Sequence, residues 1–369
     1  MTGPQVELVD AGRSRPLPHV DMTTELAGVS YRNPVFTASG CSAAGQELAQ
    51  FFDPALLGGI VTKSIMIQPR SGRATPRMAE TPSGMLNSIG LQGPGVEAFL
   101  DRDLPWLAEH GVPAVVSIAG TSVDEYVKLA SRVRGRPGLS MLEVNISCPN
   151  VEDRGQVFAC DPGAAAAVIS AVRRVSSVPV LAKLSPDVTS IVDVARACVD
   201  AGANGLSMIN TTLGVVIDTD TLRPTLANVT GGLSGPAVRP MAVRCVWQVH
   251  AALPDVPVVG MGGIRSGLDA LQFLAAGASA VSVGTAIFGD PHAPLRILAE
   301  LQEALADRGF RSVADVVGIA HRAPERKVSE TPDPPGSTDD EPDRTRHDRH
   351  ETTDLTEPLA GLRTPEGEA

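Results

Sequence analysis

Short apolar runs alternate along the chain with longer stretches in which apolar residues recur every three or four positions. The short runs are typical of buried strands, and the longer stretches are typical of helices with one buried face. The expected strands are 34–38, 59–64, 114–118, 140–146, 178–184, 205–209, 256–260 and 280–283. The expected helices are 95–109, 122–133, 161–175, 189–201, 236–252, 266–276 and 293–308.

This alternation predicts an α/β protein, and specifically a (β/α)8 TIM barrel. A doubly wound open sheet is the alternative, and it is disfavoured because no G-x-G-x-x-G sequence occupies the first strand–helix turn. Residues 64–94 show no helical pattern, so we expect them to form an insertion over the C-terminal mouth of the barrel.

Composition divides the chain into three parts. Residues 1–24 form an N-terminal extension, 25–322 the barrel, and 323–369 an acidic tail rich in Pro, Asp and Thr. From residue 324 onward there are 13 Asp and Glu against 6 Lys and Arg, with few large apolar residues, which predicts disorder. We expect solvation to be the tail's only role, with partner docking as the alternative. The barrel has no basic patch that would suit nucleic acid.

The cysteine pattern indicates reduced thiols. Five cysteines are widely spaced without a C-x-x-C pair, which argues against zinc or an iron–sulfur cluster held by this chain alone. The first residues contain no apolar signal segment, and no stretch approaches the length of a membrane span. We therefore expect a soluble, cytoplasmic protein with no metal and no membrane contact.

The sequence EVNISCPN at 143–150 places a thiol and two amides at the end of a buried strand. Cys148 follows the apolar run, Asn145 and Asn150 flank it, and Pro149 stops the strand from continuing. Parallel α/β proteins carry their chemistry at such strand ends. The alternative is that Cys148 is a buried structural cysteine, as most free cysteines are.

Two glycine-rich turns follow the last two expected strands, where this fold usually binds phosphate. Gly262 and Gly263 lie in GMGGI, and Gly284 and Thr285 lie in VGTAIF. Glycines let backbone N–H groups approach an anion, so these four residues predict a phosphate site. Ordinary turn chemistry is the alternative.

Lysines and amides gather at other strand ends. Lys63 and Lys183 end otherwise apolar strands, where a lysine is costly unless it is paired or faces a ligand; a lysine that extends to the rim is the alternative. Amide-bearing residues recur at the same expected face, at Asn87, Asn145, Asn150 and Asn210, the last followed by Thr211. Amides without matching carboxylates suit a planar polar ring such as a pyrimidine.

Together these motifs resemble the dihydroorotate dehydrogenase family, class 1 and more particularly its 1B branch. The matching stretches are collinear over about residues 25–320: TASG (37–40), VTKSIMIQPR (61–70), GMLNSIGLQGPGV (84–96), EVNISCPNV (143–151), AKLSPDVT (182–189), INTT (209–212), GGLSGPAVRP (231–240), GMGGI (260–264) and VGTAIF (283–288). The run NSIGLQGPGV indicates the 1B branch rather than the fumarate-using 1A branch. Class 2 members carry serine at the base position and an N-terminal membrane helix, neither of which this chain has.

The resemblance implies FMN-dependent oxidation of (S)-dihydroorotate to orotate in de novo pyrimidine (UMP) biosynthesis, with Cys148 taking the C5 proton and FMN the C6 hydride. It assigns to FMN the residues Ser39, Lys63, Ser64, Ser117, Asn145, Lys183, Ile209, Gly235, Gly262, Gly263, Gly284 and Thr285. It assigns to the substrate Lys63, Asn87, Ser88, Ile89, Gly90, Leu91, Asn145, Asn150, Asn210 and Thr211. Ser117 stands where the family usually has asparagine.

The resemblance also implies a partner. The chain carries no NAD fingerprint, so electrons are expected to reach NAD⁺ through a second subunit with FAD and a [2Fe–2S] cluster. A homodimer, or a heterotetramer of two catalytic and two electron-transfer chains, is expected. The alternatives are a fumarate-dependent 1A-like enzyme, another flavin-dependent dihydropyrimidine oxidoreductase, a barrel that binds an unrelated phosphorylated substrate, and a non-catalytic flavoprotein subunit.

Overall fold

Eight parallel strands pair in the order β3-β16-β15-β10-β9-β8-β7-β4 in the computed structural model, which describes residues 19–146 and 161–322. These strands are β3 (Val35–Thr37), β4 (Ile60–Val61), β7 (Ala114–Ile118), β8 (Leu139–Asn145), β9 (Val180–Leu184), β10 (Gly205–Met208), β15 (Val258–Met261) and β16 (Ala280–Val283). A parallel bridge between Phe36 and Gly59 joins the first strand to the segment before β4. The sheet therefore closes, and the predicted barrel is confirmed.

The chain divides into two units, 1–323 and 324–369, and the second lies outside the described residues. The predicted N-terminal extension falls almost entirely outside them as well, and so does the predicted disordered tail.

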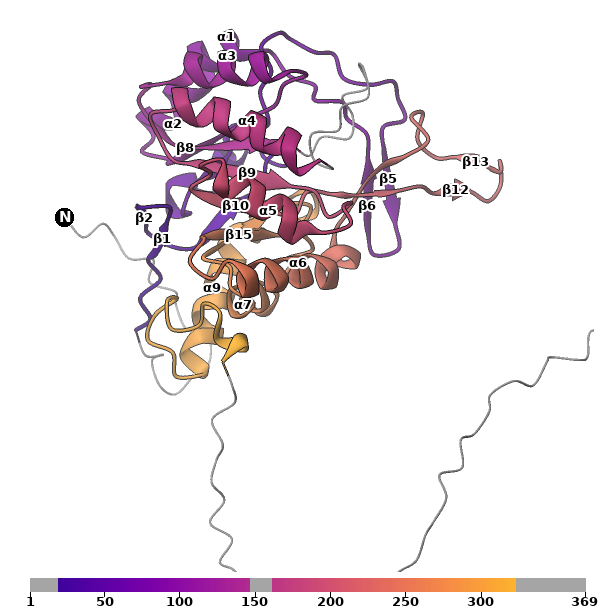
Figure 1. Ribbon diagram of the computed structural model, residues 1–369. Coiled ribbons are helices and arrows are strands. Elements are labelled where there is room, and N and C mark those ends of the chain that lie inside the picture. The colour runs from indigo at the N-terminus through magenta and orange to yellow at the C-terminus, as the bar shows by residue number, and fades with distance from the viewer. Residues whose placement is uncertain (1–18, 147–160, 323–369) are drawn as a thin grey trace, which may run out of the picture. The chain divides into compact units, whose positions relative to one another are not determined.

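Helices follow the barrel strands and lie outside them (Figure 1). The expected helix at 95–109 is continuous but divides into α1 (Val96–Ala98), a π-helical segment η3 (Phe99–Asp103) and α2 (Leu104–Glu109). The others are α3 (Val123–Val133), α4 (Pro162–Val175), α5 (Ile191–Asp200), α6 (Arg239–Ala252), α7 (Gly267–Ala275), α8 (Ala286–Gly289) and α9 (Ala293–Asp307), with 3-10 turns at Leu48–Gln50, Pro54–Leu56, Pro236–Val238 and Ile319–His321. Within the described ranges, none of the helices combines the length and apolar character that a bilayer crossing requires.

The sequence signals for helix ends have the expected geometry. The side chain of Ser122 accepts a hydrogen bond from Glu125 N at 3.3 Å, and Ser266 accepts one from Asp269 N at 3.2 Å. Asp161, before Pro162, accepts one from Gly163 N at 2.7 Å. Each cap satisfies backbone N–H groups that the first helical turn leaves without a partner.

The barrel interior has an apolar layer below a polar one. Side chains that alternate along the strands bring Phe36, Val61, Val115, Met141, Leu181, Val259 and Ala280 together in one cluster. The hairpin of β1 (Thr24–Leu26) and β2 (Val29–Tyr31) adds Leu26 and Tyr31 to it. Two residues further along β8 and β9 the inward positions become polar, at Glu143 and Lys183. The apolar layer thus lies on the side of the polar layer away from the strands' carboxyl ends.

A second, antiparallel sheet lies at the carboxyl ends of the barrel strands (Figure 1). Its order is β11-β14-β6-β5, formed by β5 (Met78–Thr81), β6 (Gly84–Asn87), β11 (Thr212–Gly214) and β14 (Gly231–Ser234). The insertion expected at 64–94 supplies the β5–β6 hairpin. The sequence patterns did not predict the strands of this second sheet, the β1–β2 hairpin or the small β12 (Ile217–Asp218) and β13 (Arg223–Pro224) pair, because each of these strands is only two to four residues long.

Candidate active site

A cavity of about 770 Å³ opens at the carboxyl ends of the barrel strands. It is lined by strand ends of the barrel, by the β5–β6 hairpin, by β14 and by the turns after β15 and β16. Segments far apart in the sequence therefore share one site, as expected for a parallel barrel. The insertion walls one side of the cavity, so it contributes directly to the site.

A buried ion pair lies at the floor of this cavity. Lys183 Nζ donates a hydrogen bond to Ser39 Oγ at 2.7 Å and lies 3.4 Å from Glu143 Oε1. The Lys183 side chain is 4% exposed and the Glu143 side chain 1% exposed. Ser207 Oγ donates to the other oxygen of Glu143 at 2.6 Å. Lys183, which the sequence predicted as a site residue, is thus paired with the Glu143 carboxylate, which the sequence did not indicate.

Asn145 is held by a chain of serine hydroxyls. Its Nδ2 donates to Ser64 Oγ at 3.1 Å, and that hydroxyl lies 2.8 Å from Ser117 Oγ. The Tyr126 hydroxyl donates a hydrogen bond to the backbone carbonyl oxygen of Asn145 at 2.7 Å. Ser117 is fully buried and its side chain does not line the cavity. The geometry therefore has Ser117 supporting Ser64 and, through it, Asn145.

The turn after β15 leaves no room for a side chain at Gly263. Gly263 has a φ of +75°, and a Cβ there would lie 2.7 Å from the carbonyl oxygen of Gly235. Gly235 itself has a φ of +93°, and a Cβ there would lie 2.6 Å from Gly84 Cα. Backbone from β14 and from the turn after β15 meets closely here, as a cradle built from main-chain groups requires.

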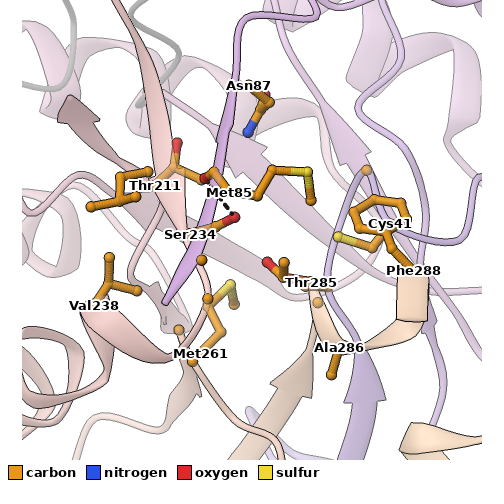
Figure 2. Close-up of a pocket in the computed structure, with 18 of the residues that line it drawn as sticks. Cys41, Met85, Asn87, Thr211, Ser234, Val238, Met261, Thr285, Ala286 and Phe288 are labelled. Atoms are coloured by element: carbon orange, nitrogen blue, oxygen red, sulfur yellow. Dashed lines mark hydrogen bonds between the residues drawn. The ribbon is translucent and has the colours of Figure 1, made fainter. Parts of the chain in front are cut away.

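The amides and the glycine turns mark different sides of the cavity. Figure 2 shows Asn87 and Thr211 together on one side, from β6 and the segment after β10, whereas Thr285 and Ala286 lie on another. Asn87 Nδ2 donates to the Gly232 carbonyl at 3.3 Å, and Asn210 Oδ1 accepts from Thr211 N at 2.9 Å. The cavity thus offers amide and hydroxyl groups on one side and a glycine turn on the other.

Cys41 is a thiol of the cavity wall that sequence reasoning did not select. Burial raises its pKa to about 11, although the nearby charges of Lys183 and Lys63 act in the opposite direction. A thiol with this pKa stays protonated at neutral pH and is poorly suited to act as a base. Its only sequence signal was its place just after TASG.

Most of the predicted residues that the structure describes line this one cavity. They are Ser39, Lys63, Ser64, Asn87, Ile89, Gly90, Leu91, Asn145, Lys183, Ile209, Asn210, Thr211, Gly235, Gly262, Gly263, Gly284 and Thr285. Ser88 and Ser117 are fully buried and do not line it. Cys148 and Asn150 lie outside the described residues. Direct ligand contacts remain predictions for all of them.

The barrel is closed and parallel, its cavity has a lysine at its base, and glycine turns follow its last two strands. These features define a barrel enzyme that binds a phosphorylated cofactor or substrate. The family model for dihydroorotate dehydrogenase matches residues 21–305. The chain belongs to the dihydroorotate dehydrogenase family.

This chain matches several relatives over almost their whole length. Those named dihydroorotate dehydrogenase B (NAD(+)), catalytic subunit include proteins from Geobacter sulfurreducens and Desulforudis audaxviator. The first is 50% identical over 298 residues, covering 81% of this chain and 97% of the relative. The second is 50% identical over 303 residues, covering 82% and 98%. The resemblance to the 1B branch is thereby confirmed.

Proposed function

We propose that this chain oxidises (S)-dihydroorotate to orotate with FMN, as the catalytic subunit of an NAD⁺-linked enzyme of pyrimidine biosynthesis. The observation that carries the proposal is the cavity itself. The cavity brings together Lys183, Asn145, the side that carries the amides, and the glycine turns. The chain is also 50% identical to relatives named dihydroorotate dehydrogenase B (NAD(+)), catalytic subunit. The names of these relatives also favour NAD⁺ over fumarate as the final acceptor.

The residues of the cavity fit FMN. The turns at Gly262–Gly263 and Gly284–Thr285 offer main-chain N–H groups to a phosphate, the group that such turns bind. The Ser282 hydroxyl also lines the cavity, is buried and has no hydrogen-bond partner within residues 19–146 and 161–322. Lys183 and Asn145 supply a cation and an amide for a polar ring. When bound, FMN supplies the acceptor for the C6 hydride.

The chain's own residues bind the substrate and remove its C5 proton. We assign Asn87, Asn150, Asn210 and Thr211 to the polar edge of the dihydroorotate ring, and the turn 87–91 with Lys63 to its surroundings. Cys148 takes the C5 proton at its thiolate sulfur. An ordinary thiol has a pKa near 8.5, so turnover is expected to rise toward alkaline pH. Ser64 and Ser117 orient Asn145 through their hydroxyls.

A partner subunit completes the reaction in this proposal. The relatives' name, catalytic subunit, supports a partner that carries electrons onward. We assign FAD and a [2Fe–2S] cluster to that partner, and a heterotetramer built on a catalytic homodimer to the assembly. We also propose a cytoplasmic location, which suits the free thiols Cys41, Cys198 and Cys245.

Anaerobic titration tests the proposal. The purified full-length chain should carry yellow FMN, and dihydroorotate should bleach it with formation of one orotate per flavin. Dihydrouracil is the matched control and should leave the flavin oxidised. A colourless protein, or a flavin that dihydrouracil bleaches equally well, would contradict the assignment. Efficient NAD⁺ reduction by the single chain would contradict the partner.

A further inference from the structure

The carboxylate of Glu143 is the most deeply buried charged group in the described part of the barrel interior. Glu143 is 1% exposed to solvent, and Lys183, the next most buried charged residue there, is 3% exposed. Burying a charge is costly unless a partner and hydrogen bonds compensate it. Lys183 and Ser207 provide this compensation, one to each carboxylate oxygen. The carboxylate of Glu143 is therefore buried at a cost in desolvation free energy, whereas the layer below it is filled by apolar side chains.

The position of Glu143 in β8 relates it to both layers. Met141, Glu143 and Asn145 alternate along one face of the strand. Met141 belongs to the apolar cluster, Asn145 lines the cavity, and Glu143 lies between them without lining the cavity. Glu143 therefore acts on the cavity through Lys183, which does line it.

We propose that Glu143 is a positioning residue that sets the charge presented to the bound flavin: it holds Lys183 against Ser39 and balances its positive charge. This inference rests on the proposed binding of FMN beside Lys183. A lone lysine would place one uncompensated positive charge next to the ring. Paired with Glu143, the floor of the cavity is close to neutral.

This neutrality has a consequence for electron transfer. Reduction adds negative charge to the flavin, and an uncompensated Lys183 would favour the reduced form more strongly in a low-dielectric site. The carboxylate therefore lowers the reduction potential of the bound flavin. A lower potential makes onward transfer of electrons to the partner easier, which suits a subunit whose electrons have to leave.

The midpoint potential of the bound flavin tests the inference. In Glu143→Gln, which keeps the shape and removes the charge, the two-electron equilibrium should shift at least about tenfold toward the reduced flavin, a rise of about 30 mV. Glu143→Asp, which keeps the charge, should stay closer to the wild-type potential. An unchanged or lowered potential in flavin-loaded Glu143→Gln would overturn the inference.

A second comparison keeps the test decisive if Glu143→Gln alone does not fold. The double variant Lys183→Met/Glu143→Gln removes both charges and leaves no unpaired buried charge. Because the paired floor of the cavity is close to neutral, the two-electron equilibrium of its flavin should stay within about tenfold of wild type, about 30 mV, and a larger fall in potential would overturn the inference. A wild-type chain that retains no flavin would instead refute the proposed function, so the two failures are distinct.

Discussion

The Arg239 guanidinium lies 2.5 Å from the Asp269 carboxylate, and this ion pair joins α6 to α7 beside the Gly262–Gly263 turn. Asp269 also accepts a hydrogen bond from Arg265 N at 2.9 Å, and Arg239 donates to the Gly263 carbonyl at 3.4 Å. The turn that we assign to phosphate is thus fixed by two side chains that do not themselves form it.

We expect Asp269→Asn to weaken FMN binding about tenfold, because a charge-assisted hydrogen bond contributes about 1.5 kcal/mol. Fluorescence titration of the flavin-stripped protein measures this. Asp124→Asn is the matched control, since it breaks the exposed pair with Lys128 on α3. Equal affinities in the two variants would show that the Asp269 pair does not hold the turn.

We expect Gly263→Ala to abolish stable FMN retention and to destabilise the protein by about 1–3 kcal/mol, since it forces an alanine into a left-handed backbone. The new Cβ would also meet the Gly235 carbonyl at 2.7 Å. Gly93→Ala is the control, because nothing lies within 4 Å of a Cβ there. Flavin content after purification and thermal unfolding are the measurements, and a fully loaded Gly263→Ala protein would be inconsistent with the cradle.

We expect Cys148→Ala to lose at least about 100-fold in turnover with dihydroorotate, the lower range for removal of a general base. Flavin content and orotate affinity should stay close to wild type, because the cavity residues that hold them are unchanged. Stopped-flow reduction of the flavin separates this effect from a loss of binding. Near-normal turnover would remove Cys148 from the mechanism.

The alkaline rise of turnover should survive the loss of Cys41. Burial raises the pKa of that thiol to about 11, so it remains protonated through pH 9 and gains charge only well above it. Cys41→Ala should therefore keep the wild-type pH profile between about pH 6 and 9, whereas an ordinary thiol at Cys148 titrates near 8.5 within that range. A flat profile in Cys41→Ala would identify Cys41 as the base.

Local patterns in the sequence were sufficient to predict the barrel. Each barrel strand is a short apolar run, and helix ends carry caps such as Ser122, so periodicity and capping indicate the same elements. The glycine turns after the last two strands were also visible, since the order of strands determines where they lie.

The antiparallel sheet at the mouth was not visible in the sequence. The pairing of β14 with β6 spans a long separation, as between Gly232 and Asn87, and the glycine-rich β14 shows no period of two. Such pairing depends on contacts that form only once the barrel has brought both segments together.

What the sequence determined by itself is the alternation of strands and helices, the chemical groups at the strand ends, and the family. Only the tertiary structure decided which groups act together. Lys183 is joined to Glu143 and Ser39, Asn145 to Ser64, and Arg239 to Asp269. The physical reason is that charges and hydrogen bonds act over a few ångströms in space, whereas these partners are separated in the chain by tens of residues or more.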